Sequence, residues 1–442
     1  MWSSVSGFIK RHRNKALITA GIVGGVYWVG QYAKNKLVEM QAKMARDRLF
    51  QDNLRRRFEQ NLQDCTFTVM SLLPTLCDPL LDSMNVERLV QTLKEYRKSP
   101  IEGTSVTAHS ETESSHPEMT SVSTDEVHPT KSRVELWEEI KLQSFTRTLT
   151  ALYCLDFLTV FVYLQLNLIG RYIYVDSVAS LVHPKDPQDM TGSLPSTSLP
   201  TGKARRLPFR VEQGYLTLTW WFLHRGWDQC RDLIDQAVQD VVSQVSLKAK
   251  LTHLELVGLV SQIRQQVEKE QGERVALRKR FISNLLPTSP EDLRQTLVSG
   301  GADPSLLDDP AFQEILSETR DFLESEDFEL VCARCLDRSF VVFFDTLHQF
   351  FPELPVPTPA TSSVVKAEGG ESTLTTDLVS EFEQFNAVEP RLPLATLIPR
   401  VTREVHQILN GFPNQYLDAI TSVPELQALS AIIYTTSESY AP

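Results

Sequence analysis

Apolar residues recur three or four positions apart along most of this chain, a spacing typical of helices that bury one face. The pattern predicts one long helix from 34 to about 64, a second through 65–76 with Pro74 as its kink or end, and a third over 86–96. Further helices are predicted over 132–175, 211–270, 274–286, 289–299, 311–324, 325–351, 374–385, 392–410 and 414–437. Sustained period-two alternation is missing. The fold class is therefore predicted as all-α, an N-terminal single transmembrane helix followed by one large elongated helical bundle.

The stretch 16–33 carries no charge over eighteen residues and is flanked on both sides by lysine and arginine. As a helix it would be about 27 Å long, close to the roughly 30 Å of a bilayer core. A cleaved signal peptide and a buried soluble helix are the alternatives, but a basic, helix-favouring stretch follows at once. We predict a short basic N-terminus (1–15), a membrane anchor (16–33) and a helical-bundle domain (34–442), whose side of the membrane the basic flanks do not settle. The predicted anchor residues are Leu17, Ile18, Gly21, Ile22, Gly25, Val26, Trp28 and Val29.

Two stretches interrupt the helical pattern. Residues 99–130 are rich in Ser, Thr, Glu, His and Pro, and about 176–209 are rich in Pro, Gly and Ser. Neither has enough apolar residues to offset the entropy of ordering, so both are predicted to be disordered inserts. The helical pattern resumes after the first insert at Ser132, a candidate N-cap with Glu135 at capping-box spacing.

The most apolar part of the body, 149–175, has two interpretations. It could be a second membrane span or a helix packed on all sides. The uncharged run between Asp156 and Arg171 is only fourteen residues long and contains Gln165 and Asn167. A span needs about 20 predominantly apolar residues, so a buried central helix is favoured.

Motifs for catalysis or nucleotide binding are missing from the sequence. Cys332 and Cys335 form a lone CxxC without a second ligand pair, so a zinc site is not predicted. Asp156 could be a buried acid with a perturbed pKa, but a structural role is favoured, either at the helix edge or paired with Arg147 or Arg171. We predict a non-enzymatic protein with no cofactor, no metal and no small-molecule substrate.

Charge and cysteine content further restrict the possible partners and cellular compartment of the protein. The net charge of −12 argues against a nucleic-acid partner, and the basic residues are dense in the first sixty positions, where they could face anionic lipid. The six cysteines are scattered over 442 residues, which is not the pattern of a disulfide-stapled secreted domain. A membrane-tethered binding scaffold in a reducing compartment is the interpretation that remains.

A series of short stretches in order along the chain matches one family. They are FIKRH (8–12), GGVY (24–27), TVMSLLPTL (68–76), ELWEEIK (135–141), SFTR (144–147), QLNLIGRYIY (165–174), VSLK (245–248), ETRDFLES (318–325) and LPLATLIP (392–399). On these residues the chain resembles the peroxin three family of peroxisomal biogenesis factors. The resemblance runs from end to end except over the two inserts.

The resemblance implies a single-pass peroxisomal membrane protein whose bulk faces the cytosol. It also implies a partner, the soluble import receptor for peroxisomal membrane proteins (peroxin nineteen), which docks an amphipathic helix in a groove. The family's groove tryptophan corresponds to Trp137, with Leu93, Lys94 and Arg133 at neighbouring groove positions. Taken alone, the helical spacing of Trp137 with Val134 and Ile140 favours a core residue.

Two other classes of function stay open. A membrane-bound enzyme would need converging polar groups that the sequence does not show. A non-catalytic organelle or lipid tether would use the basic juxtamembrane helix, in particular Arg55, Arg56 and Arg57.

Overall fold

The structure is a computed structural model that describes residues 52–98, 131–182, 207–270, 273–274, 277–351 and 390–435, with positions 36, 40, 44 and 48. The predicted anchor, the first predicted insert and the predicted helix 374–385 lie outside the described residues. The chain divides into two compact units, Met1–Gln63 and Asp64–Pro442. In the first unit every described position is helical, as predicted for the stretch after the anchor.

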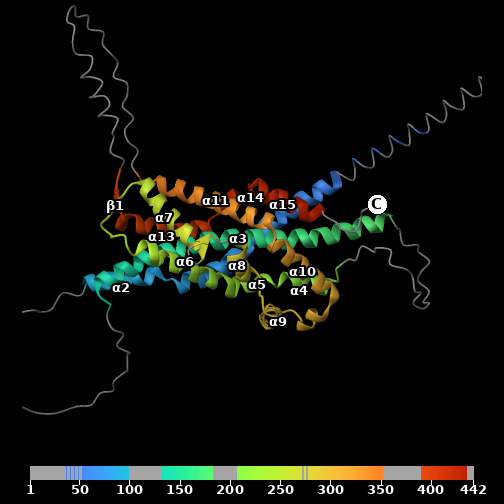
Figure 1. The fold of residues 1–442 in the computed structure, drawn as a ribbon, viewed down its shortest axis with the longest axis horizontal. Helices are drawn as coiled ribbons and strands as arrows, with labels where there is room; N and C mark the ends of the chain where they lie inside the picture. Colours follow the sequence, from blue (N-terminus) through green and yellow to red (C-terminus); the bar gives the residue numbers. More distant parts are fainter. Residues whose placement is uncertain are drawn as a thin grey trace, which may run out of the picture. The chain divides into compact units, whose positions relative to one another are not determined.

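The second unit is a helical bundle (Figure 1). Its helices are α2 (Val86–Lys98), α3 (Arg133–Val182), α4 (Phe209–Leu216), α5 (Thr219–Trp221), α6 (Trp227–Val242), α7 (His253–Val267), α8 (Leu277–Leu285), α9 (Pro290–Ser299), α10 (Pro310–Leu323), α11 (Glu326–His348), α13 (Leu394–Asn410), α14 (Gln415–Thr421) and α15 (Pro424–Thr435). A π-helical segment covers Phe222–Gly226 and a 3₁₀ helix covers Pro304–Asp308.

Strands in the described part of the chain are two residues long. β1 (Lys250–Leu251) pairs antiparallel with β4 (Leu392–Pro393), and β2 (Lys269–Glu270) pairs antiparallel with β3 (Glu273–Arg274). The β1–β4 pair joins the segment before α7 to the segment before α13, whereas β2 and β3 form a local hairpin. The predicted all-α class is confirmed.

Helix α3 is the central element of the second unit. It packs against α13, α6, α15, α11 and α2, which surround it in Figure 1. It is long and apolar enough to cross a membrane, but 94% of its most apolar window is buried inside the fold. Because its apolar residues lie all around the helix, it needs neighbours on every side. The prediction of a buried central helix over 149–175 agrees with this packing.

Gln165 and Asn167, two polar residues within this apolar helix, have hydrogen-bond partners. The Gln165 side-chain amide donates to the Tyr215 carbonyl at 3.1 Å and accepts from the Thr219 hydroxyl at 2.6 Å. The Asn167 amide donates to the Tyr163 carbonyl one turn back, at 2.7 Å. A buried polar group costs little when it is hydrogen-bonded, so these residues are compatible with the core.

Three predicted boundaries are wrong. The chain is helical without a break from 52 to 83, so Pro74 does not end a helix. Leu73, Leu76 and Cys77 around it are buried, and their packing outweighs the hydrogen bond that proline removes. Helix α3 continues to Val182, seven residues into the predicted second insert, whose 183–206 portion lies outside the described residues. The single helix predicted over 414–437 is two, because Pro424 begins α15.

The π-helical segment ends at Gly226, where the backbone closely approaches α8. A Cβ atom placed there would lie 1.9 Å from the Asn284 carbonyl oxygen at the end of α8. We expect Gly226→Ala to destabilise the fold by about 2 kcal/mol, because the two segments must separate. Thermal unfolding of the full chain followed by circular dichroism measures this.

The matched control is Gly258 in α7, where an added Cβ meets nothing within 4 Å. Gly258→Ala should be neutral or stabilise by up to about 1 kcal/mol, since alanine favours a helix more than glycine. Equal melting temperatures for the two variants would contradict the packing described for Gly226.

Candidate partner-binding site

Helix α3 begins with the capping box that the sequence predicts. The Ser132 backbone N–H donates to the Glu135 carboxylate at 2.8 Å, and the Glu135 N–H donates to the Ser132 hydroxyl at 3.3 Å. These two bonds satisfy N–H groups that have no partner within the helix. The cap therefore fixes Arg133 as the first residue of α3 and places Trp137 one turn further along.

An apolar cluster joins the first turns of α3 to α2. Ile140 of α3, Val86 of α2 and Ile398 of α13 are each 2% exposed and form its centre. Four half-buried residues pack against this centre, namely Leu89, Val90, Leu93 and Leu247. We call these seven residues the α2–α3 cluster. Because its four outer residues, Leu93 among them, are only half-buried, the cluster exposes some apolar surface to solvent.

One of the four predicted contact residues belongs to this cluster, and the other three do not. Leu93 belongs to it. Trp137 is half-buried and precedes Ile140 by three residues and Lys141 by four, so it lies on their side of α3. Lys94 and Arg133 are exposed. The structure thus places Leu93 in the cluster and leaves both cations exposed, while Trp137 lies on α3 three residues before the cluster's Ile140.

A fully buried arginine fixes α2 against α3. The Arg147 guanidinium donates to both carboxylate oxygens of Glu87, at 2.7 and 2.9 Å, and to the carbonyls of Met84 and Thr402 at 3.3 and 3.4 Å. The hydrogen bond from Arg147 holds the pKa of Glu87 below its usual range. The Arg147 guanidinium of α3 therefore contacts residues of both α2 and α13. These contacts help to position the three helices that form the cluster.

A second buried cation, Lys141, holds the beginning of α3. Its ammonium donates to the Val245 carbonyl at 2.8 Å and pairs with Glu138 at 2.6 Å. Val245 lies in the connection between α6 and β1, so this bond ties that connection to α3. Trp137 is one turn before Lys141, and its backbone position is consequently well defined.

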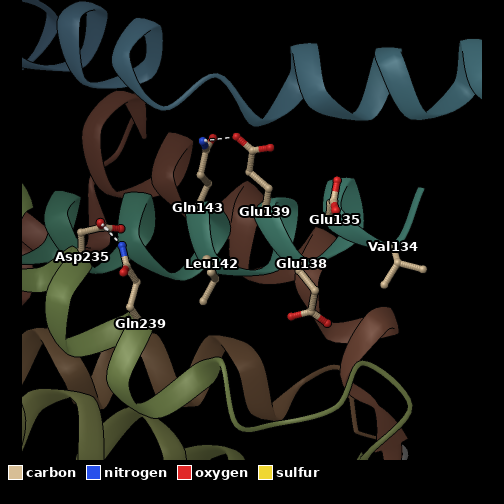
Figure 2. Close-up of a pocket in the computed structure, with 8 residues that line it drawn as sticks. All are labelled: Val134, Glu135, Glu138, Glu139, Leu142, Gln143, Asp235 and Gln239. Carbon is tan, nitrogen blue, oxygen red and sulfur yellow. Dashed lines mark hydrogen bonds between the residues drawn. The ribbon is translucent and has the colours of Figure 1, made fainter. Parts of the chain in front are cut away.

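A separate pocket of about 440 Å³ lies beside α3, lined by other residues (Figure 2). Its lining residues are Val134, Glu135, Glu138, Glu139, Leu142, Gln143, Asp235 and Gln239. None of the four predicted contact residues is among them. Several of its acidic groups already have partners: Glu139 pairs with Lys131, Glu138 with Lys141, and Asp235 accepts from Gln239 at 2.6 Å. The pocket is therefore distinct from the predicted groove.

The sequence did not single out Ile398 and Leu247 for this site. They come from α13 and from the connection before β1, more than 100 residues after α3 begins. The periodicity of 392–410 marks Ile398 as core, but no local pattern says which helix it meets. Ile140 was recognised only as an apolar neighbour of Trp137.

The candidate chemical groups are buried and structural. All six cysteines are free and buried, and burial raises the pKa of Cys332 well above its usual value. Groups of three potential metal ligands do not occur among the residues that the structure describes. The CxxC pair has no ligand environment there and would be a poor nucleophile or metal ligand.

Asp156 is a buried acid without the arginine partner that the sequence suggested. Arg147 pairs with Glu87 and Arg171 pairs with Glu318, so the pairing predicted for Asp156 is wrong. Burial raises the pKa of Asp156, although the Ser339 hydroxyl, 3.0 Å from its carboxylate, acts in the opposite direction. The residue is 1% exposed, so its carboxyl group lies in the core of the described bundle.

The fold and the cluster define an all-helical scaffold organised around one buried apolar helix. The Peroxin-3 family model matches residues 7–436, and the chain belongs to this family of peroxisome biogenesis factors. A peroxisomal biogenesis factor 3 of Yarrowia lipolytica is 30% identical over 97% of this chain and 98% of its own length.

Two further relatives agree with this assignment. The Homo sapiens peroxisomal biogenesis factor 3 is 29% identical over 98% of this chain and 97% of its own length. A Komagataella phaffii protein named peroxisomal membrane protein PEX3 is 29% identical over 59% of this chain and 58% of its own length. Family membership supports a role in peroxisome biogenesis and membrane-protein import, and the family is not one of known enzymes.

Proposed function

We propose that this chain is a membrane-anchored docking factor for the soluble receptor of peroxisomal membrane proteins, peroxin nineteen. In this proposal residues 16–33 cross the peroxisomal membrane once and the bundle faces the cytosol, where it binds an amphipathic helix of the receptor. The observation that carries the proposal is the position of Leu93. It lies half-buried in the α2–α3 cluster, which also contains Ile140, three residues after Trp137 on α3.

The arrangement suits a helix-in-groove contact. An amphipathic helix presents apolar residues at three- and four-residue spacing, and it needs an apolar surface with a large aromatic anchor. Leu93 and Trp137 supply such a surface. Lys94 and Arg133 lie exposed around it, where charges mainly steer encounter and select orientation. Because binding and release need no bond making, this function requires no catalytic group.

The test is a titration of the receptor against the full chain in phospholipid nanodiscs. Leu93→Ala should weaken binding by roughly tenfold or more, because it removes apolar contact area at the centre of the groove. Lys94→Ala should slow association and lower affinity by less than about threefold. Arg56→Ala, an exposed cation in the first unit, serves as the charge control.

Two results would count against the proposal. Unchanged affinity of Leu93→Ala would place the receptor elsewhere on the body. A loss shared equally by Arg56→Ala would instead favour an electrostatic tether at the juxtamembrane helix. Each variant must keep the melting temperature of the unmodified chain for the comparison to hold.

A further inference from the structure

The connection between α6 and β1, residues 243–249, caps the start of α13 (Figure 1). The first N–H groups of a helix have no partner within it. In α13 two of these groups donate to carbonyls of the connection. The Leu394 N–H donates to Ala249 at 2.9 Å, and the Ala395 N–H donates to Leu247 at 3.0 Å. The backbone at Leu247 is therefore fixed relative to α13, which supplies one of the three central residues of the α2–α3 cluster.

A buried cation also holds the connection. Lys141 of α3 is fully buried, and its ammonium donates to the Val245 carbonyl, two residues before Leu247, at 2.8 Å. Its other partner is the carboxylate of Glu138, whose side chain is 41% exposed. Burying an ammonium is costly, and an apolar side chain of similar size often stabilises a fold equally well. What an apolar side chain could not supply is the hydrogen bond that holds the Val245 carbonyl.

Leu247 gives the α2–α3 cluster a contribution from outside α2. Of the four half-buried residues that pack against its centre, three lie on α2 and Leu247 lies on the connection. Part of the Leu247 side chain is open to a partner, because it is only half-buried. Exposed cations follow two of these leucines, since Lys94 follows Leu93 and Lys248 follows Leu247. Such a surface suits an amphipathic helix whose apolar face is flanked by carboxylates.

We propose that Leu247 is a contact residue for the receptor helix and that Lys141 is the residue that positions it. The inference rests on the proposed docking function and adds a second segment to its surface. The receptor helix lies on apolar side chains of α2 and of the connection together. Lys141 does not touch the receptor and acts only through the connection. Because the connection is held before binding, the receptor does not have to order it, which favours association.

Hydrogen exchange of the full chain in phosphatidylcholine nanodiscs, measured by mass spectrometry, tests the contact. Addition of the receptor should slow exchange about threefold or more in 86–94 and in 243–249. Slower exchange in 86–94 alone would overturn the assignment of Leu247 and leave the docking function standing. No protection in either segment would place the receptor elsewhere, and the docking surface would then fail together with Leu247.

Single substitutions test the same contact through affinity. Leu247→Ala should weaken receptor binding about fivefold or more, because it removes apolar contact area. The matched control is Leu254→Ala, at a leucine of α7 that is 70% exposed and lies outside the cluster, and its affinity should be unchanged. If Leu93→Ala weakens binding but Leu247→Ala, with the melting temperature of the unmodified chain, does not, the proposal is overturned and the docking function is not.

A double-mutant cycle tests the positioning by Lys141. Lys141→Met keeps a side chain of similar length without the ammonium, so receptor affinity should fall about fivefold while the melting temperature changes little. Since Lys141 acts through Leu247, Lys141→Met combined with Leu247→Ala should bind no more weakly than Leu247→Ala alone. Additive losses would overturn the positioning by Lys141. So would a Lys141→Met chain that does not fold, whereas the contact of Leu247 is decided independently by exchange and by Leu247→Ala.

Discussion

Trp137→Ala is expected to weaken receptor binding by about 2 kcal/mol or more, roughly thirtyfold at least, while the melting temperature barely moves. The indole is half-buried on the face of α3 that leads to Ile140, and it has no partner chain over it in the free protein. Truncating an aromatic anchor removes contact area that only the bound helix uses. Titration of the receptor against the full chain in nanodiscs, with unfolding followed in parallel, measures both quantities.

The alternative interpretation of Trp137 as a core residue makes a different prediction. Truncation would then cost about 3 to 5 kcal/mol of folding free energy, and binding would fall only because folded protein is lost. Trp137→Phe distinguishes the groove and core interpretations further, since a smaller ring at a groove anchor should retain part of the affinity for the receptor. A Trp137→Ala protein with a clearly lower melting temperature, or with unchanged affinity for the receptor, would contradict the groove assignment.

Glu87→Ala is expected to destabilise the fold by about 2 to 3 kcal/mol, although the Glu87 side chain is 59% exposed. The cost arises at Arg147, which is fully buried and would keep only the Met84 and Thr402 carbonyls as acceptors. Removing one member of a fully buried pair typically costs about 3 to 5 kcal/mol, and the exposure of Glu87 lowers that figure. Arg88→Ala, at the next exposed position of α2, should change stability by less than about 0.5 kcal/mol.

The same pair gives stability a defined pH dependence. The pKa of Glu87 is lower in the folded chain than in the unfolded chain, because the carboxylate accepts hydrogen bonds from Arg147. Its contribution is therefore complete above the ordinary glutamate pKa of 4.5 and is lost as pH falls through the lowered folded value. In Glu87→Gln this part of the acid destabilisation should vanish. Identical pH profiles for the two proteins would show that the pair does not govern α2.

Local patterns in the sequence predicted most of the helices and where several of them begin. Ser132 and Glu135 marked the beginning of α3 because a capping box involves residues only three positions apart. The apolar residues of 149–175 indicated a helix buried on all sides because the run is too short and too polar to span a bilayer. The family series was likewise readable without coordinates, since it depends on residue order alone.

The candidate site was only partly predictable. Trp137, Leu93, Lys94 and Arg133 were named from the resemblance, and the structure places one of them, Leu93, in the α2–α3 cluster. That Ile398 completes the cluster could not be predicted, because α13 and α3 are more than 200 residues apart in sequence. The role of the receptor groove itself remains a prediction for the binding experiments.

The sequence by itself determined the helical class, the central buried helix and the family, because each depends on short-range spacing or on order along the chain. Tertiary structure alone decided which charges meet. Arg147 pairs with Glu87, 60 residues away, and not with Asp156, nine residues away on the same helix. Residues nine apart on a helix are two and a half turns apart and so lie on opposite sides of it. Packing of α2 against α3 brings Glu87 within 2.7 Å, and that contact exists only once both helices are buried against each other.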